Sequence, residues 1–172
     1  GKSTLVRCLI RLIEATSGHI YVDSEDVTSL DEKALRDFRR TKVSMVFQNF
    51  GLLPHRNVMD NACYGLEIKG VSKHERYQKA QTMLDMVGLN GWESSKVSQL
   101  SGGMQQRVGL ARAMAVEPDI LLMDEPFSGL DNRLRDEVRD STLALLKDEG
   151  TAVLLVTHEP EEAMRMADQI AL

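Results

Sequence analysis

The chain has 172 residues, of which 42% are hydrophobic and 27% are charged, and its formal net charge is −5 at pH 7. This composition is typical of a globular domain with its own core and excludes a largely disordered chain. The acidic balance disfavours a nucleic-acid partner, and no apolar run approaches the roughly 18 residues that a transmembrane helix needs. Cys8 and Cys63 form no CxxC motif, so we expect reduced thiols rather than a disulfide or a zinc site.

The first part of the chain predicts helices that alternate with short strands. Apolar residues at helical spacing, among them Leu5, Leu9 and Leu12, predict an amphipathic helix over residues 2–14. The elements expected next are a strand at 19–22, a polar helix at 31–40, a strand at 42–47 and a loop at 48–56.

The middle of the chain predicts helices alone. One helix is expected over residues 58–68. Ser72 and Glu75 form a capping box that opens a second helix, which ends at Gly88. After a loop, a third helix begins at Ser101. This segment therefore reads as a helical insertion between strands.

The last part of the chain returns to alternating strands and helices. Such alternation indicates an α/β fold with a parallel sheet. The expected elements are a strand at 120–123, a helix at 132–148, a strand at 152–156, a helix with Pro160 in its first turn and the start of another strand at 169–172.

Polar side chains follow three of these strands at the point where each strand ends. Gln48 follows the strand at 42–47, Asp124 and Glu125 follow the strand at 120–123, and His158 follows the strand at 152–156 shortly after its end. Ligands of open α/β sheets bind beyond the carboxyl ends of the strands. These side chains are therefore expected to meet at one phosphate-sized site.

The first four residues, Gly1, Lys2, Ser3 and Thr4, match the end of the P-loop pattern G-x-x-x-x-G-K-[ST]. In that pattern the lysine reaches the β- and γ-phosphates, and the hydroxyl after it binds Mg²⁺. Alone, such a tetrapeptide is more often a polar helix start. Together with the polar strand ends it predicts a site for ATP and Mg²⁺ at the start of the first helix.

A second anion site is expected where Ser101, Gly102 and Gly103 open a helix. The free N–H groups of a first helical turn and the helix dipole together favour an anion. About twenty residues later the chain delivers Asp124 and Glu125 at the end of an apolar strand, one carboxylate for a metal and one for a water. The arrangement closely resembles the signature motif and the Walker B motif of ABC-type ATPases.

The resemblance implies a role for each candidate residue. Asp124 would bind Mg²⁺ and Glu125 would act as the general base or orient the attacking water. Gln48 resembles the Q-loop residue that senses Mg²⁺ and that water, and His158 resembles the switch histidine that contacts the γ-phosphate. Asp131 ends a stretch that resembles the D-loop, which communicates across a dimer.

One residue departs from the family pattern. The family form of the signature is Leu-Ser-Gly-Gly-Gln, and this chain has Met104 in the fifth place. The departure affects a peripheral nucleotide contact, because Ser101 and Gly103 remain.

The family also implies an architecture. Residues 1–47 and 118–172 would form a RecA-like P-loop NTPase core, and residues 48–117 would form the inserted helical subdomain. The core is expected to be incomplete at both ends, since residue 1 is not a methionine and the chain stops within an expected strand. Two such subunits would pair head to tail, with ATP between the P-loop of one and the signature of the other.

The resemblance further implies transport. ATP hydrolysis would drive membrane-embedded permease subunits, which dock on residues 49–55 and hold the protein at the cytoplasmic face of the inner membrane. An exposed Phe-Leu-Leu cluster at residues 50, 52 and 53 suits such docking.

Three alternatives concern the function in detail. Residues 46–58 and 64–67 look like ATPases of glycine betaine/proline importers, whereas residues 133–168 look as much like those of iron(III) or polyamine importers. A soluble ABC ATPase of DNA repair or translation is disfavoured by the acidic charge. A non-catalytic binding module is disfavoured because both Glu125 and His158 are present.

Overall fold

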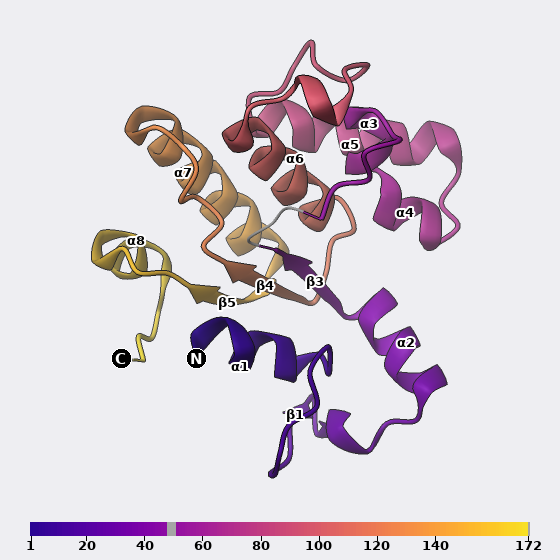
Figure 1. The fold of residues 1–172 in the computed structure, drawn as a ribbon, viewed down its shortest axis with the longest axis vertical. Coiled ribbons are helices and arrows are strands. Elements are labelled where there is room, and N and C mark those ends of the chain that lie inside the picture. Colours follow the sequence, from indigo (N-terminus) through magenta and orange to yellow (C-terminus); the bar gives the residue numbers. More distant parts are fainter. Residues whose placement is uncertain (48–50, 172) are drawn as a thin grey trace.

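The computed structural model describes residues 1–47 and 51–171. Within this part of the chain, three strands form a parallel sheet in the order β3-β4-β5, and a short antiparallel hairpin lies apart from it (Figure 1). The strands are β1 (Tyr21–Val22), β2 (Glu25–Asp26), β3 (Val43–Val46), β4 (Ile120–Asp124) and β5 (Ala152–Val156). The α-helices are α1 (Lys2–Leu9), α2 (Glu32–Thr41), α3 (Val58–Ala62), α4 (Tyr64–Ile68), α5 (Lys73–Met86), α6 (Gly102–Met114), α7 (Asn132–Glu149) and α8 (Pro160–Met166).

Strand β4 is the centre of the sheet, and its apolar side chains are divided between two hydrophobic clusters, one on each face. Leu122 packs with Val6 of α1 and Phe38 of α2. Leu121 and Met123 belong to the cluster that α6 and α7 cover on the opposite face (Figure 1). A parallel strand covered on both faces is apolar throughout rather than alternating with polar residues. This explains the uninterrupted Ile-Leu-Leu-Met run.

The register of the sheet brings the carboxyl ends of its strands to one edge. Val46 pairs with Met123, and Asp124 pairs with Val156. The residues that follow each strand therefore leave the sheet side by side, as expected for a parallel sheet.

Helices α3 to α6 form the helical insertion between β3 and β4. Their buried residues continue into the same hydrophobic cluster as Leu121 and Met123, and they include Leu84 of α5 and Val108 and Leu110 of α6. The division of the chain into a core of residues 1–47 and 118–172 and a helical subdomain of residues 48–117 stays a prediction. No helix in the described residues is long and apolar enough to cross a membrane.

Three expected elements differ from the structure. The helix expected over residues 2–14 ends at Leu9, because Arg39 Nε donates to Ile10 O at 2.7 Å and Arg11 adopts a left-handed φ of 50°. The helix expected over residues 58–68 is two helices, α3 and α4, with a bend at Cys63, whose φ and ψ are −89° and 2°. Residues 169–171 form no strand.

The two cysteines lie in different parts of the fold, Cys8 in α1 and Cys63 between α3 and α4. Cys8 and Cys63 are both free, and Cys63 is fully buried among the helices of the insertion. Burial raises the pKa of the Cys63 thiol, because the thiolate would lose its hydration. This thiol is therefore protonated and unreactive at neutral pH.

The approach of α4 to Val116 gives a stability prediction. A Cβ on Gly65 would lie 2.5 Å from Val116 Cγ1, and Lys69 Nζ donates to Val116 O at 2.8 Å, which holds this segment in place. We expect the clash to cost about 1–3 kcal/mol against the ~1 kcal/mol gained in helix propensity, so that Gly65→Ala destabilises the protein by up to about 2 kcal/mol. In a Val116→Ala background, which removes the clash, the sign should reverse. Thermal unfolding of the four proteins tests this, and a loss of stability in both backgrounds would contradict it.

Candidate functional site

The start of α1 meets the end of β4 at a buried carboxylate. Ser3 Oγ donates to Asp124 Oδ1 at 3.0 Å, and Asp124 is only 1% exposed. Its other oxygen, Oδ2, is buried and has no hydrogen-bond partner among the residues that the structure describes. A buried carboxylate oxygen without a partner is costly, and a cation beside it would remove that cost.

These groups fit Mg²⁺. Magnesium in phosphate-processing sites is held by one or two protein oxygens, with water and phosphate oxygens completing its octahedron. Ser3 and Asp124 would supply the hydroxyl and the carboxylate. In the described part of the chain no group of three or more His, Cys, Asp or Glu side chains is close enough to cage a metal.

Glu125 leaves the end of β4 in an unusual backbone conformation. Its φ is 52°, in the left-handed region that residues with a side chain seldom adopt. The backbone of Glu125 is held in place, since its N–H donates to Val156 O at 2.8 Å. The carboxylate leaves the sheet and lies 3.0 Å from His158 Nδ1 through its Oε1. The structure thus brings these two predicted residues into contact.

The start of α1 also reaches the end of β5. Lys2 Nζ lies 3.5 Å from Thr157 O, directly before His158. Gly1 is the N-cap of α1 and provides no side-chain cap, so the first N–H groups of this helix are available to an anion. Thr4 lies in this first turn and is exposed. The end of the P-loop pattern therefore lies at the same edge of the sheet as Asp124.

The second predicted anion site lies elsewhere in the chain. Ser101 is the N-cap of α6 and its Oγ accepts from Met104 N at 3.3 Å. Gly102 has open space around it, with no atom within 4 Å of a built Cβ. Helix α6 covers the face of the sheet opposite to α1 (Figure 1). The structure therefore does not bring Ser101, Gly102 and Gly103 to the start of α1.

Two further predicted site residues have other outcomes. Asp131 is the N-cap of α7, and its Oδ1 accepts from Leu134 N at 3.1 Å. Its carboxylate thus has a local structural role, and its part in nucleotide binding stays a prediction. Gln48 lies outside the described residues.

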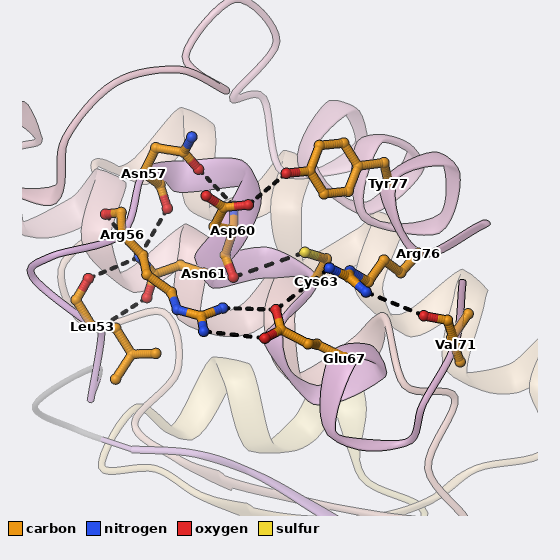
Figure 2. Close-up of polar contacts among 10 residues, drawn as sticks. All are labelled: Leu53, Arg56, Asn57, Asp60, Asn61, Cys63, Glu67, Val71, Arg76 and Tyr77. Atoms are coloured by element: carbon orange, nitrogen blue, oxygen red, sulfur yellow. Dashed lines mark hydrogen bonds and ion pairs between the residues drawn. The ribbon is translucent and has the colours of Figure 1, made fainter. Parts of the chain in front are cut away.

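The segment that follows β3 is fixed by a residue that the sequence reasoning missed. Asn61 of α3 is completely buried, and its Oδ1 accepts from Leu53 N at 2.7 Å. Its Nδ2 donates to Leu53 O at 3.1 Å, to Arg56 O at 3.3 Å and to Asn57 O at 2.9 Å (Figure 2). One amide thus ties the loop to the insertion. Its spacing of four residues after Asn57, the cap of α3, is the only local signal of this role.

Ion pairs extend this support at the surface. Arg56 makes two hydrogen bonds to Glu67, at 2.8 and 3.2 Å (Figure 2). Its guanidinium lies 4.8 Å from the ring centre of Tyr64. The hydrogen bond from Arg56 is the main cause that lowers the pKa of Glu67. Between α5 and α3, Tyr77 donates to Asp60 Oδ1 at 2.6 Å, and this hydrogen bond is the main cause that raises the pKa of Tyr77 to about 12.

The exposed apolar cluster predicted for this segment is only partly correct. Leu52 and Leu53 are half-buried rather than exposed, and Leu52 packs against the main hydrophobic cluster. Phe50 lies outside the described residues. The exposed residues of the loop are Gly51, Pro54 and His55.

Comparison with known proteins identifies the family. The profile of the ABC transporter family matches residues 1–128. The chain belongs to this family. It is 54% identical over 172 residues to the glycine betaine transport ATP-binding protein OpuAA of Bacillus subtilis, and all of the chain and 41% of that protein are covered. It is 49% identical over 172 residues to the trimethylamine N-oxide transport ATP-binding protein TmoW of Pelagibacter ubique, covering all of the chain and 50% of that protein. The chain thus spans about half the length of these curated relatives or less.

Solved structures agree with this ABC assignment and confirm the predicted fold class. The dimeric structure of MJ0796, a bacterial ABC transporter cassette, superimposes with a TM-score of 0.90 at 35% identity, covering 95% of this chain and 72% of that one. A post-hydrolysis dimer of the same cassette bound to ADP and Pi has a TM-score of 0.89 at 35% identity, with the same coverage. The α/β sheet with an inserted helical region is therefore the fold of an ABC cassette.

The bonds of Asn61 predict local order in this ABC cassette. We expect Asn61→Ala to weaken the protection of the Leu53 amide by about 1–3 kcal/mol, because a partly buried N–H loses its acceptor. Hydrogen exchange of the full-length protein measures this. Asn57→Ala is the matched control, since it removes the cap of α3 but leaves the Leu53 bond in place. Equal deprotection of Leu53 in both variants would show that Asn61 has no specific role.

Proposed function

We propose that this chain is the ATP-binding and ATP-hydrolysing part of an importer subunit. The observation that carries the proposal is the 3.0 Å bond between Ser3 Oγ and Asp124 Oδ1, which joins a helix start to a buried carboxylate at the carboxyl edge of the sheet. In P-loop enzymes a hydroxyl at this place and an acidic residue after a buried strand hold the magnesium of a nucleotide.

The binding roles follow from the position of α1. Lys2 and the N–H groups at Gly1, Ser3 and Thr4 would bind the phosphates of ATP. Ser3 and Asp124 would hold Mg²⁺, with Gln48 as the further ligand that the family pattern implies. When bound, Mg²⁺ neutralises charge on the β- and γ-phosphates.

The hydrolytic role is assigned to Glu125. Its carboxylate leaves the edge of the sheet next to Asp124 and would accept a proton from the attacking water or orient that water. His158 contacts Glu125 Oε1 through Nδ1 at 3.0 Å, and its side chain is 62% exposed. The other ring nitrogen, Nε2, lies 3.6 Å from Glu159 Oε1, so contact with a γ-phosphate would require this nitrogen to move away from that carboxylate.

The partner is a second ATP-binding subunit. Ser101, Gly102 and Gly103 cannot cover a nucleotide on α1 of their own chain, because the sheet lies between α1 and α6. A head-to-tail pair would place this signature segment over the ATP of the partner. The dimers of MJ0796, one of them with ADP and Pi, support this arrangement.

Permease subunits are the proposed membrane partner. Hydrogen bonds from the side chain of Asn61 hold the loop at residues 51–57 in place. Pro54 and His55 of this loop are exposed, which suits a rigid docking surface. Docking there would hold the subunit at the cytoplasmic face of the inner membrane, as a peripheral protein.

The proposed solute is a small methylated amine such as glycine betaine. Support comes from the betaine transport proteins among the relatives, at 54% identity in Bacillus subtilis and 47% in Escherichia coli. The trimethylamine N-oxide relatives extend the class to another dipolar compound with a fully substituted nitrogen. These identities favour this class over the iron(III) or polyamine alternative.

The hydrolytic role of Glu125 predicts a binding-competent but inactive variant. We expect Glu125→Gln in the full-length protein to lower kcat by at least about 100-fold, the usual contribution of a general base, while ATP still binds. ATPase assays and binding of a fluorescent ATP analogue measure the two effects, and ATP should trap a dimer in gel filtration. Glu161→Gln, on the exposed first turn of α8, is the control for loss of a carboxylate. Turnover of Glu125→Gln near the wild-type rate would remove Glu125 from this role.

The solute assignment predicts a selective loss of uptake. Cells that lack the gene should lose uptake of labelled glycine betaine or trimethylamine N-oxide, and the wild-type gene but not its Glu125→Gln form should restore it. Labelled spermidine, ferric complexes and methionine serve as competing substrates. Loss of one of these with unchanged betaine and trimethylamine N-oxide uptake would refute the methylated-amine assignment and leave the ATPase proposal intact.

A further inference from the structure

Gln106 is a buried amide whose two polar atoms both contact the segment that follows β4. The residue is 3% exposed and lies in the first turns of α6. Its Nε2 donates to Glu125 O at 2.9 Å, and its Oε1 accepts from Gly129 N at 2.9 Å. A buried amide is stable only when such partners are present. Gln106 therefore joins the signature helix to two backbone groups of the Walker B and D-loop region.

The start of α6 and the segment that follows β4 are packed closely against each other. A Cβ on Gly103 would lie 2.6 Å from Gly129 O, and a Cβ on Gly129 would lie 2.5 Å from Gln106 Oε1. Ser128 Oγ also donates to Glu125 O, at 3.1 Å. Because close-packed groups move together, a shift at the start of α6 must be passed to the peptide of Glu125 or break these bonds.

The backbone of Glu125 has particular need of such support. Its left-handed φ of 52° is unfavourable for a residue with a side chain and persists only where the surroundings hold it. Val156 O holds the N–H of this residue, and Gln106 and Ser128 hold its C=O. The direction of the Glu125 carboxylate thus depends in part on α6.

We propose that Gln106 is a positioning residue that couples the two nucleotide sites of the dimer. Within one chain it ties Glu125, which faces the nucleotide on its own α1, to Ser101–Gly103, which faces the nucleotide of the partner. Closure of the signature on the partner's phosphate would then be felt at the chain's own carboxylate, which is a coupling between distinct sites. The inference rests on the head-to-tail dimer and on the role of Glu125 proposed above.

Mixed dimers of the full-length protein test the coupling. Each dimer carries Glu125→Gln in one subunit, so that only the other subunit hydrolyses ATP, and different affinity tags on the subunits allow its purification. In the first arrangement Gln106→Leu is in the hydrolysing subunit. In the second it is in the subunit that carries Glu125→Gln and supplies the signature. The reference dimer has no change at Gln106.

We expect kcat to fall by about tenfold in both arrangements, the effect of leaving buried backbone groups without partners. Binding of a fluorescent ATP analogue should stay within about twofold, because Gln106 is not a phosphate ligand. A rate equal to the reference in either arrangement would overturn the coupling. Absence of ATPase activity in the wild-type full-length protein would instead refute the proposed function, whatever Gln106 does.

Two further variants separate positioning from folding. Gln106→Glu keeps the shape and the acceptor for Gly129 N but cannot donate to Glu125 O, so it should also slow both arrangements. Full activity of this variant would overturn the proposal even if Gln106→Leu fails to fold. Gln105→Leu is the matched control, because its Nε2 contacts Val97 O at 3.4 Å and Leu100 O at 3.2 Å rather than the Walker B region. It should have an unchanged rate at a similar thermal unfolding temperature.

Discussion

The burial of Asp124 at the end of a doubly covered strand is the constraint on which the rest of the structure depends. Strand β4 has a neighbour on each side and an apolar cluster on each face, so its last residue emerges into a dry environment. A carboxylate there must be paired, and within the described residues the Ser3 hydroxyl donates to one of its two oxygens. The position of α1, and with it the end of the P-loop pattern, is thus tied to a carboxylate whose other oxygen has no partner among the described residues.

Helix α6 connects the segment after β4 to more distant parts of the chain through hydrogen bonds. Seven of its 13 residues are buried. Several of its polar side chains end on the backbone of other segments. Gln106 contacts the segment after β4, Arg107 donates to Val87 O and Gly88 O at the end of α5, and Arg112 donates to Gly51 O at 2.7 Å. Each such bond contributes about 1 kcal/mol net and costs more when broken. The loop at residues 51–57 and the segment after β4 are therefore held by the same helix.

Local sequence signals predicted the parts of this structure whose causes are local. The apolar run of β4 and the helix caps Ser72 and Ser101 depend on neighbouring residues, and they lie where expected. The early end of α1 could not be predicted, because Arg39 captures Ile10 O from a distant helix. The contacts of Asn61 and Gln106 could not be predicted for a related reason. Their burial follows from packing between segments, and an isolated glutamine or asparagine in a helix carries no sign of its partners.

The methionine at the fifth signature position illustrates how the fold separates binding from packing. Met104 donates its backbone N–H to Ser101 Oγ at 3.3 Å, while its side chain is half-buried against the main hydrophobic cluster. The anion-binding capacity of this turn resides in backbone N–H groups and the helix dipole, which do not depend on that side chain. Met is a flexible apolar residue that fills irregular gaps. Met in place of the family's Gln therefore adds to the packing of the main hydrophobic cluster and leaves the Ser101 cap of α6 in place.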